Sequence, residues 1–187
     1  MDSSVPALPR PSPWIAGHAH LIAPGGSVLD VACGGGRHVR WLHARGHRLY
    51  AVDRNADAVE PLRDVASVLV ADLESGPWPY PGRQFDAVVV TNYLWRPLLP
   101  SIVASVAPGG VLLYETFAAG QGSIGRPSNP EFLLRPGELL DAARPALRVI
   151  AYEDGYVERP QPAFVQRIAA VRERSDASAA DRYNLAI

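Results

Sequence analysis

A short apolar segment runs directly into a glycine-rich loop, and this junction holds the residues with the clearest chemistry. Residues 28–32 are apolar apart from Asp30, and Gly34, Gly35 and Gly36 follow almost at once. Glycines let the backbone come close to a ligand because no Cβ stands in the way. A carboxylate beside exposed amide donors suits a ligand that carries both a cationic amino group and an anionic carboxylate.

Two further acids follow apolar runs in the same manner. Asp53 follows the run 48–52 directly, and Asp72 follows the run 68–71. Parallel strands in α/β folds bring their carboxyl ends to one edge of the sheet, where ligands bind. The Asp53 carboxylate suits the two hydroxyls of a ribose. For both acids a plain structural role, as an exposed turn residue or a polar cap, stays open.

Alternating strand and helix patterns are expected to position these residues. The apolar runs predict strands over 28–32, 48–52, 68–71, 85–91, 111–116, 147–156 and 164–173. Helical spacing predicts helices over 14–22, 36–45, 56–66, 97–106 and 137–143. Strict alternation favours an α/β fold, with a parallel sheet covered by helices on both faces. We expect a flexible arm over 1–13, one domain over 14–173, a loose tail over 174–187, and a lid formed by the arm together with the loop-rich stretch 117–137.

Composition excludes several classes of protein. The chain has 187 residues, 48% of them hydrophobic and 20% charged, with a net charge of −1. This balance favours small-molecule substrates and gives no electrostatic footprint for nucleic acid. One cysteine, Cys33, excludes an intramolecular disulfide, and no metal site is expected. The N-terminus lacks the pattern of a signal peptide, and no apolar run approaches the ~20 residues that span a membrane, so we expect a cytoplasmic protein. Nothing predicts the oligomeric state.

The segment around Asp30 and the glycines resembles the first motif of the class I S-adenosylmethionine (SAM) methyltransferases. This family has a Rossmann-like three-layer fold, with a seven-stranded, mostly parallel sheet that ends in an antiparallel hairpin. The resemblance implies that Asp30 takes the methionine amino group, Asp53 the ribose and Asp72 the adenine amino group, with Leu73 against the ring. It implies cofactor contacts at Asp30, Ala32, Gly34, Gly36, His38, Asp53, Arg54, Asp72, Leu73 and Asn92.

Two other interpretations of the glycine loop remain open. A dinucleotide loop would have the pattern G-x-G-x-x-G, but Val39 stands where the third glycine belongs. A plain glycine-rich turn in an α/β protein is the second alternative.

The substrate side is expected at the ends of the fourth and fifth strands. Asn92, Tyr93, Tyr114 and Glu115 are candidates for the acceptor pocket, and Arg126 in the following loop is a candidate for orienting an anionic acceptor. This part of the chain resembles the small bacterial methyltransferases of the tellurite-resistance and thiopurine types. No catalytic base is evident, which favours a soft or already ionised nucleophile.

The prediction is therefore methyl transfer from SAM to a small-molecule acceptor, with S-adenosyl-L-homocysteine (SAH) as product. A non-catalytic SAM-binding or sensing protein, a nucleotide-dependent oxidoreductase and a protein methyltransferase remain as alternatives.

Overall fold

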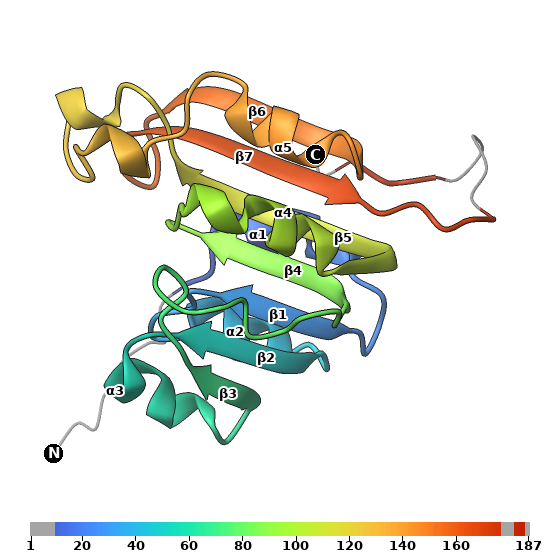
Figure 1. Cartoon of the computed structure of the whole chain (residues 1–187). Coiled ribbons are helices and arrows are strands. Elements are labelled where there is room, and N and C mark those ends of the chain that lie inside the picture. The colour runs from blue at the N-terminus through green and yellow to red at the C-terminus, as the bar shows by residue number, and fades with distance from the viewer. Residues whose placement is uncertain (1–9, 177–181, 186–187) are drawn as a thin grey trace, which may run out of the picture.

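The computed structural model describes residues 10–176 and 182–185 and contains one seven-stranded sheet (Figure 1). The strand order is β3-β2-β1-β4-β5-β7-β6. The strands are β1 (Ser27–Val31), β2 (Arg48–Asp53), β3 (Ala66–Val70), β4 (Phe85–Thr91), β5 (Val106–Phe117), β6 (Arg148–Val157) and β7 (Ala163–Val171). The first five are parallel, whereas β7 runs antiparallel to both β5 and β6. The predicted fold class is confirmed.

Helices cover both faces of this sheet and complete three layers. One face carries α1 (Pro13–His18), α2 (Arg37–His43) and α3 (Ala56–Val59), and the other carries α4 (Leu99–Ala104) and α5 (Glu138–Ala143). Each face buries its own apolar cluster. The central strands β1 and β4 are buried almost throughout, which explains why they read as continuous apolar runs.

Several elements differ from their predicted bounds for identifiable reasons. The helix predicted over 56–66 is α3 followed by the 3-10 turn Glu60–Leu62, because Pro61 cannot continue an α-helical ladder. The helix predicted over 97–106 begins as the 3-10 turn Arg96–Leu98, which contains Pro97. Strand β5 begins at Val106 rather than Val111, since Val106 already pairs with Phe85 and the register then shifts.

Some residues of the predicted flexible arm and of the predicted loose tail pack against the domain in the described part of the chain. Residues 1–9 of the predicted arm and residues 177–181 and 186–187 of the predicted tail lie outside them. Ser12 is buried and caps α1, its hydroxyl accepting hydrogen bonds from the amides of Trp14 and Ile15. In the tail, the Asn184 carbonyl lies 2.8 Å from Nε2 of His20, and Tyr183 packs against the core on the α1 side.

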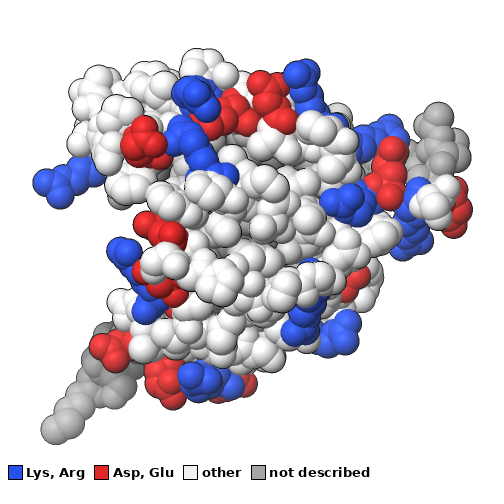
Figure 2. Space-filling model, viewed as in Figure 1, with Lys and Arg blue, Asp and Glu red and all other residues white. Residues whose placement is uncertain are grey.

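Acidic and basic side chains are interspersed on the face shown in Figure 2, where they surround a largely uncharged centre. No helix in the described part of the chain is long and apolar enough to cross a membrane.

Candidate functional site

The loop that joins β1 to α2 lies at the carboxyl edge of the sheet, on the left in Figure 1. Ala32, Gly34 and Gly36 all adopt positive φ angles, of 52°, 53° and 71°. A Cβ added to Gly36 would collide with the side chain of Leu62, whereas one added to Gly34 would meet nothing within 4 Å. Gly36 is therefore required for packing, and Gly34 leaves its open side to a ligand.

Two cavities adjoin this loop. The loop cavity, of about 330 Å³, is lined by Ala32, Cys33, Gly34, Gly35, Gly36, Arg37, His38, Thr91 and Asn92. The acidic cavity, of about 160 Å³, is lined by Ala32, Asp53, Arg54, Ala71, Asp72, Leu73, Glu74 and Tyr93. Both share Ala32, so a single elongated ligand can extend from one to the other. Together they hold all the predicted cofactor residues except Asp30.

Asp30 lies on β1 just before the loop and is 1% exposed. Its Oδ2 atom is buried without a hydrogen-bond partner among the described residues. Burial raises the pKa of this carboxyl to about 8; nearby Arg37 opposes that rise and Asp53 adds to it. A buried carboxyl oxygen without a partner is a costly arrangement, and a cationic hydrogen-bond donor would satisfy it.

Asp53 and Asp72 are held by the backbone around them. Oδ2 of Asp53 accepts the amide hydrogen bond of Gly34 at 2.8 Å, and Oδ1 accepts that of Asn55 at 2.9 Å. The Ser75 hydroxyl and the Glu74 amide both donate to Asp72, and these hydrogen bonds hold the Asp72 pKa below its usual range. Both carboxylates are thereby fixed at the rim of the acidic cavity, with acceptor capacity left for ligand hydroxyl or amino groups.

His38 lines the loop cavity but is engaged by a residue that sequence reasoning missed. Its Nε2 accepts a hydrogen bond from the Ser12 amide at 3.1 Å, and the Ser12 hydroxyl donates to Glu115 at 2.8 Å. Burial, with a contribution from Arg37, lowers the His38 pKa to about 3, so the ring is neutral at pH 7. The only sequence signal for Ser12 was its place before Pro13, typical of a helix cap.

Asn92 and Tyr93 follow β4 and face different cavities. Asn92 has a φ of 55°, and its amide donates to the Glu115 carbonyl at 2.9 Å. Tyr93 lines the acidic cavity; its hydroxyl is buried and has no partner among the described residues, and burial raises its pKa. Like Asp30, Tyr93 offers a polar atom that the described protein leaves unused.

The other acceptor-pocket candidates do not line these cavities. Tyr114 is 1% exposed in the core, and its hydroxyl donates to the Tyr93 carbonyl at 2.8 Å, so it supports the end of β4 instead. Glu115 forms an ion pair with Arg167 at 3.3 Å in addition to its contact with Ser12. Arg126 is exposed on the loop, and its side chain lines neither cavity.

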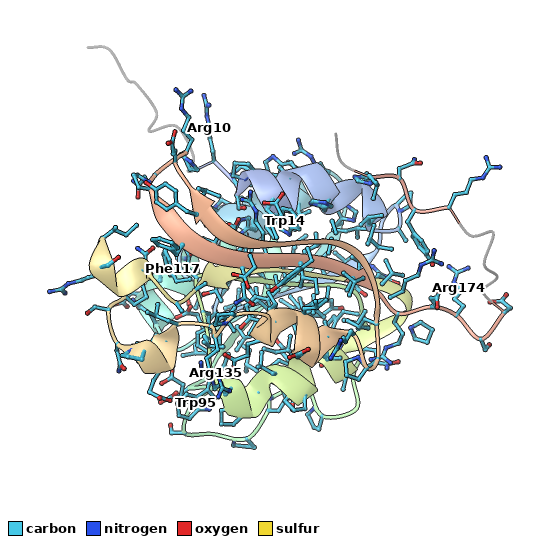
Figure 3. All side chains as sticks on the ribbon, turned by 90° about the horizontal axis from the view of Figure 1, so that it is seen from above. Arg10, Trp14, Trp95, Phe117, Arg135 and Arg174 are labelled. Carbon is cyan, nitrogen blue, oxygen red and sulfur yellow. The ribbon has the colours of Figure 1, made fainter. Side chains whose placement is uncertain are left out.

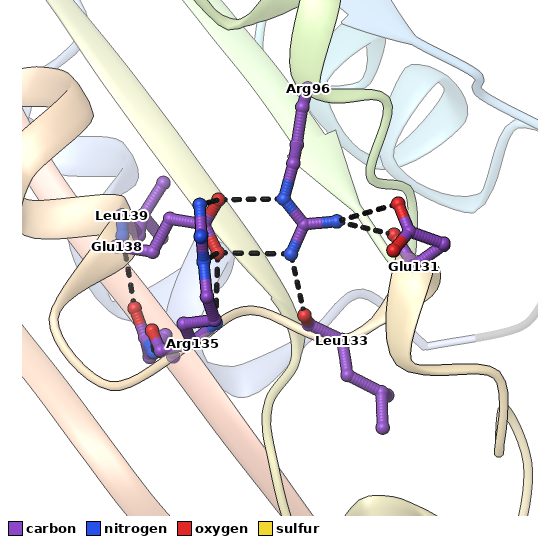
Figure 4. Close-up of polar contacts among 7 residues, drawn as sticks. Arg96, Glu131, Leu133, Arg135, Glu138 and Leu139 are labelled. Carbon is purple, nitrogen blue, oxygen red and sulfur yellow. Dashed lines mark hydrogen bonds and ion pairs between the residues drawn. The ribbon is translucent and has the colours of Figure 1, made fainter.

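Arg96 anchors the 117–137 loop (Figure 4). Its guanidinium donates to Glu138 at 2.7 Å and 3.0 Å and to the carbonyls of Glu131 and Leu133 at 2.7 Å and 2.8 Å. Arg135 adds a second contact to Glu138 at 3.2 Å. Figure 3 shows Trp95 and Arg135 on the opposite side of the sheet from Trp14 and Arg10. The 117–137 loop thus bounds the carboxyl edge of the sheet on one side, and residues 10–12 bound it on the other.

The residues present fit SAM. The unpartnered Asp30 oxygen suits an ammonium group, the fixed Asp53 and Asp72 carboxylates suit ribose and amino hydrogens, and the open side of Gly34 leaves room between them. No three His, Cys, Asp or Glu side chains gather as a metal site would require, within residues 10–176 and 182–185.

Comparison with known proteins gives the same picture. Residues 28–110 match the family described as "Methyltransferase domain". A malonyl-[acyl-carrier protein] O-methyltransferase from Serratia marcescens is 33% identical over 106 residues, which cover 52% of this chain and 40% of that protein. The chain therefore spans less than half the length of this curated relative.

Solved structures share the fold at low sequence identity. TehB from Haemophilus influenzae superposes with a TM-score of 0.68 at 20% identity, covering 86% of this chain and 61% of TehB. A SAM-dependent methyltransferase from Mesorhizobium loti gives a TM-score of 0.65 at 18% identity, with coverage of 84% and 96%.

Proposed function

Because residues 28–110 form a methyltransferase domain of the class I, SAM-dependent type, we propose that this chain transfers the SAM methyl group to a small acceptor. SAM supplies a methyl group on a sulfonium, which is a good leaving group. The observation that carries the proposal is the pair of cavities at the carboxyl edge that share Ala32, with the unpartnered oxygen of Asp30 two residues before it.

We assign the two cavities to the two halves of the cofactor. In the acidic cavity, Asp53 would hold the ribose and Asp72 the adenine amino group, with Leu73 against the base. At the loop cavity, Gly34 would leave space for the methionine chain, and Asp30, which lies two residues before Ala32 and does not itself line the cavity, would hold the ammonium group. The joint position of these groups, rather than any one of them, supports the assignment.

The acceptor we favour is an anionic or soft nucleophile. His38 is the one imidazole among the described residues that line the two cavities, and its Nε2 lone pair is already used by the Ser12 amide. The lowered His38 pKa makes it a poor proton acceptor. A nucleophile that is already ionised needs no base, so the protein's part is to align it and exclude water. The malonyl group in the Serratia marcescens relative's name carries a carboxylate, which agrees with an anionic acceptor.

Calorimetry with SAH tests the cofactor site. Wild-type protein should bind SAH, and Asp53→Ala should abolish binding while circular dichroism shows that the fold survives. Asp57→Ala, at an exposed position on α3 outside both cavities, is the matched control and should bind normally. Tight binding by Asp53→Ala would remove Asp53 from the site.

Labelled SAM with an acceptor panel tests the reaction. We expect mass spectrometry to find a methylated product among carboxylic acids, thiols and metalloid oxyanions. SAH binding without methylation of any acceptor would favour a SAM-sensing protein instead. Label that appears only on amino-acid side chains of polypeptides would favour a protein methyltransferase.

A further inference from the structure

A third cavity, of about 490 Å³, lies on the outer side of α2, and we name it the arginine cavity. One wall is a face of α2 formed by Arg37, Arg40, Trp41 and Ala44, which are spaced as neighbours on one side of a helix. The opposite wall includes Arg10, which Figure 3 shows on the α1 side of the sheet. The volume falls within the range of small-molecule sites.

The lining combines cationic groups with an apolar floor. None of the described residues that line this cavity is acidic. Arg40 is partly engaged by Asp64 at 3.4 Å, whereas Arg37 forms no ion pair within the described part of the chain. Arg40 also donates to the Pro61 carbonyl, which leaves Arg10 and Arg37 as the cations available to a ligand, and an anion would relieve the repulsion between these two. Trp41 offers an aromatic surface, already covered on one side by Arg45 at 3.5 Å from the ring centre.

The arginine cavity adjoins the loop cavity. Gly35 and Arg37 line both of them. A Cβ added to Gly35 would meet nothing within 4 Å, so a ligand can approach the backbone closely at a residue that both cavities share. A ligand in the arginine cavity therefore extends toward the region assigned to the methionine half of the cofactor.

We propose that the arginine cavity binds the distal part of the methyl acceptor, as an organic anion with an aromatic or apolar body. Its body would lie against Trp41 and Pro11, and its anionic oxygens would accept hydrogen bonds from Arg10 and Arg37. The role as acceptor site rests on the proposed function, whereas the binding of an aromatic anion is tested on its own.

The probe is the fluorescent aromatic anion 8-anilinonaphthalene-1-sulfonate, titrated separately into the protein without SAH and into the protein saturated with SAH. Wild type should bind one equivalent, and the uncharged analogue N-phenyl-1-naphthylamine should bind more weakly. Arg10→Gln and Trp41→Ala should each weaken binding of the sulfonate by about five- to tenfold, the effect of losing one charged or aromatic contact. Arg10 is exposed, so its substitution leaves the core intact.

Arg144→Gln is the control, because it removes the same charge from an exposed position on the other side of the sheet. Its sulfonate affinity should stay within about twofold of wild type. Equal affinities for wild type, Arg10→Gln and Trp41→Ala would overturn the inference, as would equal losses in Arg10→Gln and Arg144→Gln. Failure of the wild type to bind SAH in calorimetry would instead count against the proposed function. A failure of the inference about the arginine cavity can therefore be distinguished from a failure of the proposed function.

Discussion

Asp30 should couple cofactor binding to proton release, because burial holds its pKa at about 8 while a bound ammonium group needs the ionised carboxylate. At pH 7 a group with that pKa is about nine-tenths protonated, so binding should release close to one proton. The observed affinity should rise about ninefold between pH 6 and pH 7 as the proton becomes easier to remove. This rise in affinity should stop near pH 7.5, because the ligand's own ammonium group begins to lose its proton above that pH.

Calorimetry in two buffers with different ionisation enthalpies measures the released proton directly. Asp30→Asn keeps the shape of the side chain but cannot ionise, so its SAH binding should release no proton at this site and should lose the rise with pH. Removing one buried charge-assisted hydrogen bond should weaken affinity by about 10- to 100-fold at pH 7.5. Asp57→Asn, exposed on α3, is the control and should behave as wild type.

The folding stability of Asp30→Asn should not fall although its affinity for SAH does. A comparison of the two therefore separates a binding defect from misfolding. The folded state holds the Asp30 proton more tightly than the unfolded state, whose pKa is near 3.8. Ionisation of Asp30 in the unfolded chain therefore favours unfolding, and it lowers the folding stability increasingly as pH rises from about 4 to 8. Asp30→Asn cannot ionise, so it should not show this loss of stability. The variant should be at least as stable as wild type at pH 7. SAH affinity that stays flat from pH 6 to 7.5, or normal binding by Asp30→Asn, would refute the reasoning.

Three further predictions concern the frame of the site. Gly36→Ala should lower the free energy of unfolding by about 2–3 kcal/mol in urea denaturation, because Gly36 has a positive φ and the new methyl group would collide with the side chain of Leu62. As the control, Gly35→Ala places a methyl group where it meets nothing, and it should lower the free energy of unfolding by less than about 1 kcal/mol. Arg96→Ala should speed amide hydrogen exchange across residues 117–137, and unchanged exchange there would deny Arg96 its anchoring role. Burial alone would raise the Glu138 pKa, but hydrogen bonds from Arg96 and the Arg135 segment hold it at about 2. The stability from this ion pair should therefore be present above about pH 4.5 and be lost as pH falls toward 2, and Glu138→Gln should flatten that part of the pH profile.

Local patterns sufficed to predict the central strands and the acids at the carboxyl edge of the sheet. The apolar runs of β1 and β4 and the position of Asp30 before three glycines depend only on neighbours in the chain. Parallel strands then carry Asp53 and Asp72 to the same edge without further information, because each acid follows a strand of the same direction.

The sequence could not decide which neighbouring side chains of one strand face the site. Tyr114 and Glu115 are both predicted for the pocket, yet successive side chains of a strand point to opposite faces, so at most one of the two could face it, and neither lines the two cavities. Tyr114 lies in the core cluster on the α4 side, and Glu115 reaches Ser12 on the other side. That choice depends on the register of β5 against β4 and β7.

By itself, then, the sequence determined the fold class and the line of acids at the carboxyl edge, because both follow from periodicity and from the direction of consecutive strands. Only the tertiary structure decided the contacts between residues far apart in the chain. Ser12 meets His38 across 26 residues, Arg96 meets Glu138 across 42, and Arg10 closes a cavity against α2. Such contacts arise from how layers pack, and no local pattern of residue types specifies them.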